Sequence, residues 1–206
     1  MKKKDKCVIF GAGNEFPENI VLPGNAVIIA ADGGMKKLDE LGISPDCATG
    51  DLDSLENAPV CGDFRVLPHI KDTTDMYEAV KIGLSLGCEE FHIYGGTGGR
   101  LDHTLANIQL AAELSAKCNS VNIYGDKYII TAVTNDIIKL PLKESGYVSV
   151  FSHSDICTGV TIKGLFYEIE DAELRNTFAL GVSNEFTGKE AEISVKNGTL
   201  CVYYEI

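Results

Sequence analysis

The sequence predicts an α/β protein with two domains, the first built around a parallel sheet and the second an antiparallel β-sandwich or barrel. From Cys7 to about Lys127, short apolar runs alternate with segments of helical period, as in βα units. After about Tyr128, apolar residues alternate with polar ones, which is typical of antiparallel strands. The chain has 206 residues, enough for two small hydrophobic cores. We therefore expect domains at 1–130 and 131–206.

Short apolar runs in the first half predict six strands. They are Cys7–Phe10, Val27–Ala31, Cys47–Thr49, Arg65–Leu67, Phe91–Tyr94 and Val121–Tyr124. Two longer segments carry apolar residues three or four positions apart, which predicts helices over Thr74–Leu86 and Leu101–Leu114. The apolar positions are Met76, Ala79, Val80 and Leu84 in the first helix and Leu101, Leu105, Ile108 and Ala112 in the second.

The second half contains several runs with the period of a strand. They include Tyr147–Phe151, Leu165–Ile169, Ala191–Val195 and Leu200–Tyr204. Turn residues separate these runs, among them Thr158-Gly159 and Asn197-Gly198. An Asn-Gly pair between alternating runs is a strong hairpin signal, so we expect the chain to end in a hairpin.

The chain is acidic, with a formal net charge of −12 from 18 Lys and Arg and 30 Asp and Glu. Binding to nucleic-acid backbones depends largely on basic side chains, so this balance argues against a nucleic-acid partner. It leaves room for a small anionic ligand that arrives with a divalent cation.

No membrane or secretion signal is visible. The longest apolar run, Ala26–Ala31, is far shorter than the roughly 20 residues of a membrane span, and the lysines after Met1 precede only a few apolar residues. Seven dispersed cysteines include no CxxC pair. We therefore expect a cytoplasmic protein without membrane association.

Six carboxylates follow the predicted strands of the first half, at or shortly after the point where each strand ends. They are Asp32, Asp51, Asp53, Asp72, Asp75 and Asp102. The carboxyl ends of strands in an open α/β sheet face one crevice, so these side chains are expected to converge. Two charges about 4 Å apart repel by about 4 kcal/mol at an effective dielectric of about 20, so such a group requires a cation. Mg²⁺ fits best because it takes carboxylate and phosphate oxygens.

Each acid also has a simpler explanation. An Asp-x-Asp pair such as Asp51 and Asp53 is common in turns and at helix N-termini, and Thr74 or Asp75 can cap the helix that follows. Capping does not exclude metal binding. Several acidic groups at successive strand ends are hard to explain by turns alone, which favours a site.

The run Gly95–Gly99 leads directly into the helix predicted from Leu101. Glycines let backbone N–H groups approach phosphate oxygens, and a helix N-terminus favours anions, so we expect this loop and Arg100 to bind phosphate. The P-loop pattern GxxxxGK[ST] is absent. Gly11-Ala12-Gly13 lacks the third glycine of a dinucleotide fingerprint and is more simply a turn.

Two polar residues of this helix, His103 and Asn107, share one face. His103 is a proton carrier, a phosphate donor or a packed residue. The last two are favoured because phosphoryl transfer depends on positioning and charge more than on acid–base help. Asn107 either borders the cleft or is a surface amide.

Taken in order, four segments of the first half resemble the thiamine pyrophosphokinase family. They are Ala31–Gly34 (ADGG), Gly50–Ser54 (GDLDS), Lys71–Asp75 (KDTTD) and Gly95–His103 (GGTGGRLDH). The second half continues the likeness with Gly164-Leu165, Gly181–Glu185 (GVSNE) and the expected final hairpin. The resemblance covers essentially the whole chain, and the ordered set is far more specific than any one motif.

The resemblance implies an N-terminal ATP-binding catalytic domain and a C-terminal β domain that contributes the thiamine pocket. It implies a homodimer whose active sites lie where domains of two subunits meet. The reaction it implies is transfer of an intact diphosphate from ATP to the hydroxyethyl group of thiamine, giving thiamine diphosphate and AMP.

The resemblance also implies roles for individual residues. Mg²⁺ is held by Asp51, Asp53 and Asp75, and thiamine is bound by Ser183 and Asn184. The expected catalytic residues are Asp32, Asp51, Asp53, Asp75, Arg100 and Asp102. The expected ATP contacts are Asp72, Thr97, Gly98, Arg100, Asp102, His103 and Asn107.

The sequence departs from the family pattern at the expected thiamine site. Several members of the family place a tryptophan against the thiamine rings, and this chain has none. Phe166, Tyr167 or Phe186 could supply a flat apolar face, or all three could be core aromatics. Two alternatives therefore stay open: a diphosphokinase for another heterocyclic alcohol, such as a hydroxymethyl pterin, and a nucleotide- or thiamine-binding module without turnover.

Overall fold

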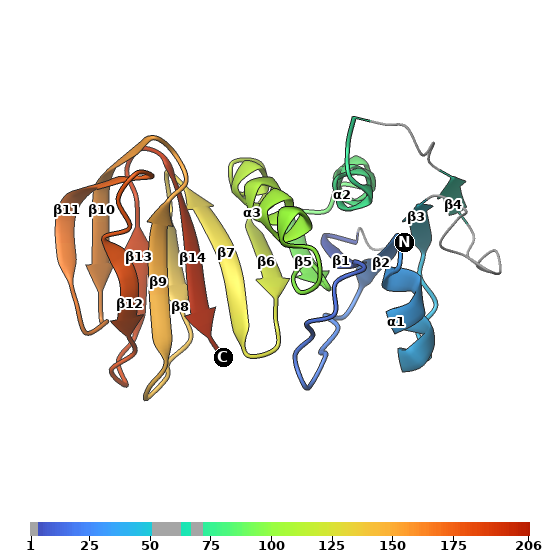
Figure 1. The fold of residues 1–206 in the computed structure, drawn as a ribbon, viewed down its shortest axis with the longest axis horizontal. Coiled ribbons are helices and arrows are strands. Elements are labelled where there is room, and N and C mark those ends of the chain that lie inside the picture. The colour runs from blue at the N-terminus through green and yellow to red at the C-terminus, as the bar shows by residue number, and fades with distance from the viewer. Residues whose placement is uncertain (1–3, 51–62, 67–71) are drawn as a thin grey trace. The chain divides into compact units, whose positions relative to one another are not determined.

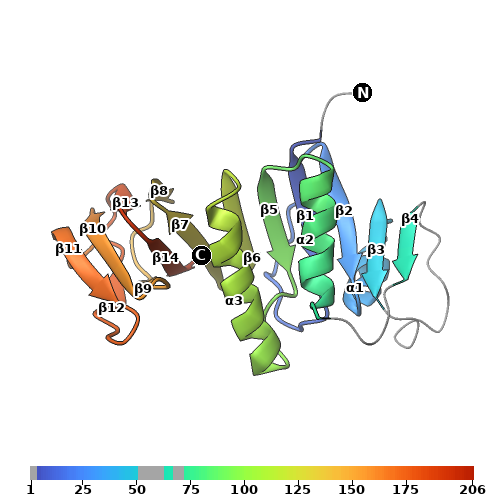
Figure 2. The same cartoon turned by 90° about the horizontal axis from the view of Figure 1, so that it is seen from above.

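The computed structural model describes residues 4–50, 63–66 and 72–206, which form two compact units. The first contains the described residues within Met1–Leu110 together with Val121–Asp126. The second contains Ala111–Ser120 together with Lys127–Ile206. Figures 1 and 2 show helices and parallel strands in the first unit and strands in the second, which confirms the predicted fold class.

No helix among the described residues has the length and apolar character needed to cross a membrane.

The first unit is a sheet with helices on both faces. Its strands follow the order β6-β5-β1-β2-β3-β4, and β1–β2, β1–β5, β2–β3 and β3–β4 pair in parallel. The elements are β1 (Lys6–Phe10), β2 (Ala26–Ala31), α1 (Gly34–Leu41), β3 (Cys47–Gly50), β4 (Asp63–Val66), α2 (Asp75–Ser85), β5 (Glu90–Tyr94), α3 (Leu101–Ser115) and β6 (Ser120–Tyr124). All six predicted strands are present, with bounds that differ by one or two residues, although Leu67 lies outside the described residues.

The central strands are apolar on both faces because helices cover both. Val8 and Phe10 of β1 pack in one cluster with Met35 and Leu38 of α1. Helix α2 lies on the opposite face, as Figure 1 shows, and buries Met76 and four further residues of the same helix there. A strand buried on both sides is a continuous apolar run, which is why β1 and β2 are recognisable in the sequence as short apolar segments.

Helix α1 is absent from the predicted elements. It has only eight residues, and its N-cap Gly33 provides no side-chain hydrogen bond, so the usual start signal is missing. Its first residue must be glycine, because a Cβ on Gly34 would lie 1.9 Å from the carbonyl oxygen of Phe10. The close packing of this helix on β1 therefore depends on the Gly33-Gly34 pair.

The strands of the second unit pair antiparallel with one another in two layers, ordered β12-β9-β14-β7 and β11-β10-β13-β8. The strands are β7 (Tyr128–Thr134), β8 (Ile137–Leu140), β9 (Tyr147–Ser152), β10 (Ile156–Lys163), β11 (Ile169–Arg175), β12 (Gly181–Glu185), β13 (Ala191–Ser194) and β14 (Thr199–Glu205). Buried side chains that include Val148, Val160, Ile193 and Val202 form the apolar interior of this β-sandwich.

Three predictions for the second half are wrong. Most of Leu165–Ile169 is the connection between β10 and β11, which begins at Ile169, because Gly164 turns the chain at φ +75° and only Leu165 of the segment is buried. Thr158-Gly159 is no turn but an irregularity inside β10, where the register with β11 shifts between Cys157 and Val160. In both places a glycine with positive φ marks a local backbone change, and the sequence does not say which kind.

Asn197-Gly198 does not close a hairpin. It joins β13 to β14, which belong to different sheets: β13 pairs with β8 and β10, whereas β14 pairs with β7 and β9. The segment instead bonds across to the irregular part of β10, where the Thr158 N–H donates to the Asn197 carbonyl at 2.9 Å. A two-residue signal identifies a sharp turn but not which strand lies beside the next one.

Candidate active site

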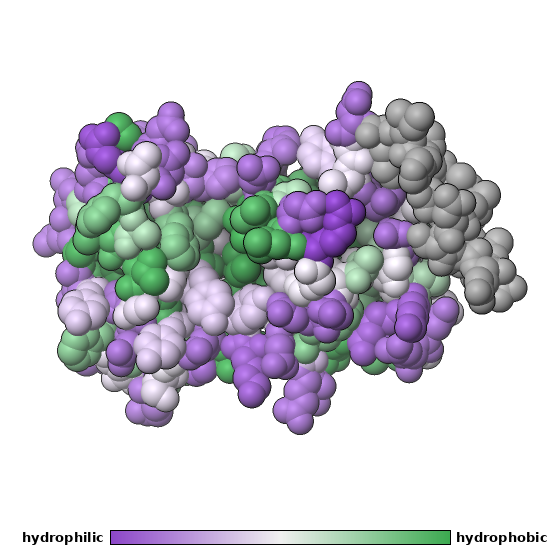
Figure 3. All heavy atoms as spheres, viewed as in Figure 1, coloured by the Kyte–Doolittle hydropathy of each residue, from purple (hydrophilic) through white to green (hydrophobic). Residues whose placement is uncertain are grey.

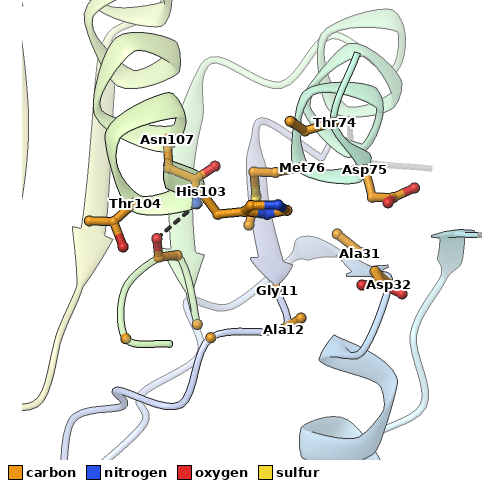
Figure 4. Close-up of a pocket in the computed structure, with 14 residues that line it drawn as sticks. Gly11, Ala12, Ala31, Asp32, Thr74, Asp75, Met76, His103, Thr104 and Asn107 are labelled. Atoms are coloured by element: carbon orange, nitrogen blue, oxygen red, sulfur yellow. Dashed lines mark hydrogen bonds between the residues drawn. The ribbon is translucent and has the colours of Figure 1, made fainter. Parts of the chain in front are cut away.

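A small pocket lies at the carboxyl ends of β1, β2 and β5, next to the starts of α2 and α3 (Figure 4). Its volume is about 60 Å³. The residues that line it are Gly11, Ala12, Gly13, Ala31, Asp32, Thr74, Asp75, Met76, Gly95, Gly96, Gly98, His103, Thr104 and Asn107. Strand ends far apart in the sequence therefore meet here, as expected for an open α/β sheet.

Thr49 connects the two acidic segments of the pocket. Its carbonyl accepts a hydrogen bond from the Asp32 N–H at 2.7 Å, and its hydroxyl donates to the Asp75 carbonyl at 3.3 Å. Asp32 has a φ of +50°, a conformation that non-glycine residues seldom adopt, so the turn after β2 is under constraint. The sequence analysis missed Thr49, whose one signal is a polar residue near the end of an apolar strand.

The first residues of α2 both cap the helix and line the pocket. Thr74 is the N-cap, since its hydroxyl accepts from the Tyr77 N–H at 3.2 Å, and Asp75 is the first helical residue. Figure 4 shows the carboxylates of Asp32 and Asp75 on the same side of the pocket. Asp72 is exposed and does not line it.

The carboxylates of Asp32 and Asp75 are suitable ligands for Mg²⁺. Both present carboxylate oxygens, which are the ligands that Mg²⁺ takes, and both line the pocket. Among the described residues no three His, Cys, Asp or Glu side chains gather as metal ligands. The other predicted ligands, Asp51 and Asp53, lie outside the described residues.

Two glycine segments form the opposite wall. The Gly11 N–H donates to the Tyr94 carbonyl at 2.8 Å, and the Gly13 N–H donates to the Gly95 carbonyl at 2.9 Å. A Cβ on Gly13 would lie 2.1 Å from the carbonyl oxygen of Thr97, so only glycine allows this approach. Gly11-Ala12-Gly13 is therefore more than a turn: it supports the Gly95–Gly99 loop.

Helix α3 contributes His103, Thr104 and Asn107. The His103 ring points into the pocket in Figure 4. The Asn107 side chain is 6% exposed, and its Nδ2 donates to the Gly96 carbonyl at 2.8 Å. The alternative of a surface amide is thus wrong, and Asn107 ties the glycine loop to α3.

Two further predicted residues lie outside the pocket wall. Arg100 and Asp102 are exposed and bind each other, with Arg100 Nη2 to Asp102 Oδ2 at 2.5 Å and Arg100 Nε to Asp102 Oδ1 at 3.1 Å. This pairing raises the pKa of Arg100 and lowers the pKa of Asp102. In this arrangement the guanidinium is engaged by a carboxylate rather than directed at the pocket.

Thr97 is buried at 1% exposed and is likewise absent from the lining residues. Its hydroxyl has no hydrogen-bond partner within the described parts of the chain.

Two of the apolar residues whose spacing predicted helix α3 lie at the surface. Leu101 is 71% exposed and Leu105 is 56% exposed, whereas Ala112 is buried. Helical period places residues on one face, but it does not tell whether another part of the chain covers that face.

In the second unit, two aromatic side chains stand at the surface of the β10–β11 connection. Phe166 is 63% exposed and Tyr167 is 62% exposed, and their rings meet edge to face at 4.8 Å between centroids. Phe186 is buried at 4% exposed. The suggestion that all three are core aromatics therefore holds for Phe186 alone.

Asn184 fixes this connection in place. Its Nδ2 donates to the Tyr167 carbonyl at 2.7 Å, and its Oδ1 accepts from the Tyr167 N–H at 2.9 Å. The side chain is 5% exposed, so its polar atoms are directed at backbone rather than at solvent. The neighbouring Ser183 is exposed at a φ of +60°, with its N–H donating to Ser149 Oγ at 3.1 Å.

Comparisons with known proteins agree with both units. Residues 20–124 match the family model described as thiamin pyrophosphokinase, catalytic domain, and residues 135–200 match the model described as thiamin pyrophosphokinase, vitamin B1 binding domain. The thiamine pyrophosphokinase of Bacillus subtilis (strain 168) is 28% identical over 181 residues, which are 84% of each chain.

Solved structures share the fold at low sequence identity. The thiamine pyrophosphokinase structure from Bacillus subtilis has a TM-score of 0.85 at 24% identity and covers 97% of this chain and 98% of its own. The enzyme from Geobacillus thermodenitrificans has a TM-score of 0.85 at 23% identity, with 98% and 97% covered. The one from Candida albicans has a TM-score of 0.77 at 14% identity, with 98% and 89% covered. Two family models in order, over most of the chain, show that this protein belongs to the thiamin pyrophosphokinase family.

Proposed function

We propose that this protein transfers an intact diphosphate from ATP to the hydroxyethyl group of thiamine, giving thiamine diphosphate and AMP. The observation that carries the proposal is the pocket in which Asp32 and Asp75 face the Gly95–Gly99 loop at the start of α3. Carboxylates beside a glycine loop and a helix N-terminus suit a phosphate chain that carries a divalent cation. Family membership supplies the reaction class.

In this proposal the residues of the pocket bind and orient the phosphates. Asp75, together with Asp51 and Asp53, would hold Mg²⁺, and Asp32 is a further acid. When bound, Mg²⁺ would supply positive charge that offsets the charge on the transferring group. Backbone N–H groups of the glycine loop and the His103 ring are placed to bind the remaining phosphate oxygens.

Arg100 and Asp102 retain a nucleotide role in the proposal, although they pair with each other in this structure. For Arg100 to bind phosphate it must exchange the Asp102 carboxylate for a phosphate oxygen. The carboxylate and the phosphate both offer anionic oxygens to the exposed guanidinium, so a phosphate can replace the carboxylate. Asp72, Thr97 and Asn107 keep proposed supporting roles, and Asn107 acts through the Gly96 carbonyl.

The acceptor is proposed to bind at the second unit, against the exposed rings of Phe166 and Tyr167 and beside the Ser183 hydroxyl. Flat heterocycles bind well to aromatic side chains, and the domain matches the vitamin B1 binding model. Asn184, which the resemblance makes a thiamine ligand, is better assigned to holding Tyr167, because both polar groups of its amide bond Tyr167 backbone.

We further propose a cytoplasmic homodimer with active sites at the subunit interface, built of a catalytic domain at 1–130 and an acceptor domain at 131–206. Exposed apolar side chains support a partner surface: Figure 3 shows them over α3, where Leu101 and Leu105 lie. Large exposed apolar patches are uncommon on monomers. Sedimentation of the purified protein tests the dimer.

Purified protein incubated with ATP, Mg²⁺ and thiamine, followed by chromatography for AMP and thiamine diphosphate, tests the reaction. Equal formation of both products, abolished by EDTA, is the expected result. AMP that forms only with another alcohol, such as a hydroxymethyl pterin, would keep the chemistry and replace the acceptor. ATP binding without AMP formation with any acceptor would instead indicate a binding module.

A further inference from the structure

Strand β12 contains a bulge, at which two of its residues lie opposite one residue of β9. The two are Val182 and Ser183, and the one is Ser149. The register pairs on either side are Gly181 with Val150 and Asn184 with Val148. A bulge interrupts the backbone ladder, so an N–H inside it needs another acceptor. That acceptor is the Ser149 side chain, because the Ser183 N–H donates to Ser149 Oγ at 3.1 Å.

Ser149 is buried, although it lies on the face of β9 that points away from the sandwich interior. Val148 and Val150 are buried in that interior, and successive residues of a strand point in opposite directions. On the other face, Tyr147 is 53% exposed and Phe151 is 40% exposed, but Ser149 between them is only 8% exposed. The bulge of β12 explains the difference, because it brings its own backbone against the serine hydroxyl.

The backbone of Ser183 is held in a conformation that suits glycine better than serine. Its φ is +60°, and its side chain is exposed. Non-glycine residues in this region persist only where surrounding contacts hold them, and they gather at functional sites. Strand β12 approaches β9 closely just before the bulge, because a Cβ on Gly181 would lie 2.4 Å from the Val150 carbonyl oxygen. The bulge therefore presents the Ser183 hydroxyl from a backbone that its neighbours fix.

We propose that Ser149 is a positioning residue for the acceptor: its hydroxyl fixes the β12 bulge and thereby directs the Ser183 hydroxyl to thiamine. The inference rests on the proposed function, in which Ser183 contacts the acceptor. Ser149 acts only through the Ser183 backbone. The adjacent aromatic turn is held separately by Asn184, whose amide bonds the Tyr167 backbone. Two different side chains thus place the two parts of the acceptor site, and removal of one leaves the hydrogen bonds of the other in place.

Ser149→Ala removes the acceptor, and Ser149→Cys keeps the size of the side chain but offers only a weak acceptor. We expect each variant to raise the Kd of thiamine about three- to tenfold, as the loss of one neutral hydrogen bond would, and to leave the KM for ATP unchanged. The matched control is Ser152→Ala, at a buried serine of the same strand whose hydroxyl donates to the Ser154 carbonyl instead. It is expected to match the wild type. Calorimetric titration with thiamine gives the Kd, and thermal melts check the fold.

Amide hydrogen exchange, followed by NMR, provides a readout besides binding. The Ser183 amide should exchange faster in both Ser149 variants and at the wild-type rate in Ser152→Ala. Unchanged exchange at Ser183, an unchanged thiamine Kd in both Ser149 variants, or an equal effect of Ser152→Ala would overturn the inference, as would a wild type that binds no thiamine. Thiamine binding that depends on Ser149, in a protein that forms no thiamine diphosphate, would refute the proposed reaction and leave the positioning role standing.

Discussion

The side-chain amide of Asn184 bonds both backbone polar groups of Tyr167, donating to the carbonyl at 2.7 Å and accepting from the N–H at 2.9 Å. Asn184 belongs to β12 and Tyr167 to the connection between β10 and β11, so one buried side chain holds a surface turn against a strand. The turn carries the exposed rings of Phe166 and Tyr167. Their orientation therefore depends on a residue that does not itself reach solvent.

Asn184→Ala is expected to weaken thiamine binding through Tyr167. The substitution leaves two backbone groups of Tyr167 without partners, which costs about 1–3 kcal/mol for each group that stays buried. We expect the KM for thiamine to rise several-fold more than the KM for ATP. Because the chain has no tryptophan, Tyr167→Trp introduces a single tryptophan, whose emission can be excited selectively, at this turn. Quenching of its emission by thiamine should decrease when Asn184→Ala is added, and unchanged quenching would contradict the positioning role.

Phe166→Ala tests the exposed aromatic surface. Loss of a ring that contacts the acceptor should raise the KM for thiamine about tenfold, as expected for about 1.4 kcal/mol of lost contact. Phe178→Ala is the control, since Phe178 is 67% exposed on the same unit but lies outside this turn. Steady-state kinetics, with thiamine and ATP varied in turn, measures the KM for each substrate in both variants. Equal effects of both variants would argue against a specific aromatic site.

Thr49→Val should impair turnover without unfolding the protein. Valine has nearly the same shape but cannot donate to the Asp75 carbonyl, so the link between β3 and α2 is lost. A small displacement of a binding group can reduce rates by about a hundredfold, and we expect a reduction of about ten- to hundredfold in kcat/KM for ATP. Circular dichroism melts monitor the fold. Wild-type kinetics in Thr49→Val would show that this hydrogen bond has no part in placing Asp75.

Asp75→Asn is expected to reduce Mg²⁺-dependent turnover by about a hundredfold or more, as removal of a group that binds the reacting phosphates through the ion would. Helix α2 should persist because Thr74 supplies its cap. Asp39→Asn, at an exposed acid of α1 outside the pocket, provides the control. Turnover is measured across a Mg²⁺ titration. If Asp75→Asn shows the wild-type dependence on Mg²⁺, Asp75 is not a ligand.

Tyr204→Phe should make stability less sensitive to alkaline pH. Burial raises the pKa of Tyr204 to about 12, whereas a tyrosine in the unfolded chain ionises near its ordinary value of about 10. Between these values the unfolded chain loses a proton that the folded protein keeps, so stability falls as pH rises, by about 2–3 kcal/mol in total.

Phenylalanine removes this contribution. Denaturant unfolding between pH 9 and 12 should therefore show a shallower decline for Tyr204→Phe than for the wild type or for Tyr147→Phe, an exposed-tyrosine control. Some decline will remain, because burial also raises the pKa of Cys201 to about 12. Parallel curves for all three proteins would show that Tyr204 titrates alike in both states.

The strands and helices of the first unit could be predicted from local patterns, because burial by helices on both faces makes each strand a short apolar run. The position of Asp32 and Asp75 at one edge of the sheet followed from the same reasoning. Helix α1 was not predicted because its start has no capping side chain. The period that predicted α3 rests partly on Leu101 and Leu105, which are exposed, because such a period identifies one face of a helix but not what covers that face.

In the second unit, alternation identified strands but not their neighbours. Asn197-Gly198 showed that the chain turns, and only the sheet pairing showed that it passes to the other sheet. Asn184 was recognised as a residue of interest by resemblance, but its partner is 17 positions away in the chain. No local rule connects those two positions.

The sequence by itself determined the α/β class, the order of most elements, the acidic strand ends and the family. Each of these depends on residue types within a few positions of one another, which backbone geometry translates directly into local structure. The tertiary structure alone decided that Thr49 joins Asp32 to Asp75, that Arg100 pairs with Asp102, and that Ser149 accepts a hydrogen bond from Ser183. Those relationships depend on which side chains meet when the segments pack, and packing involves the whole unit at once.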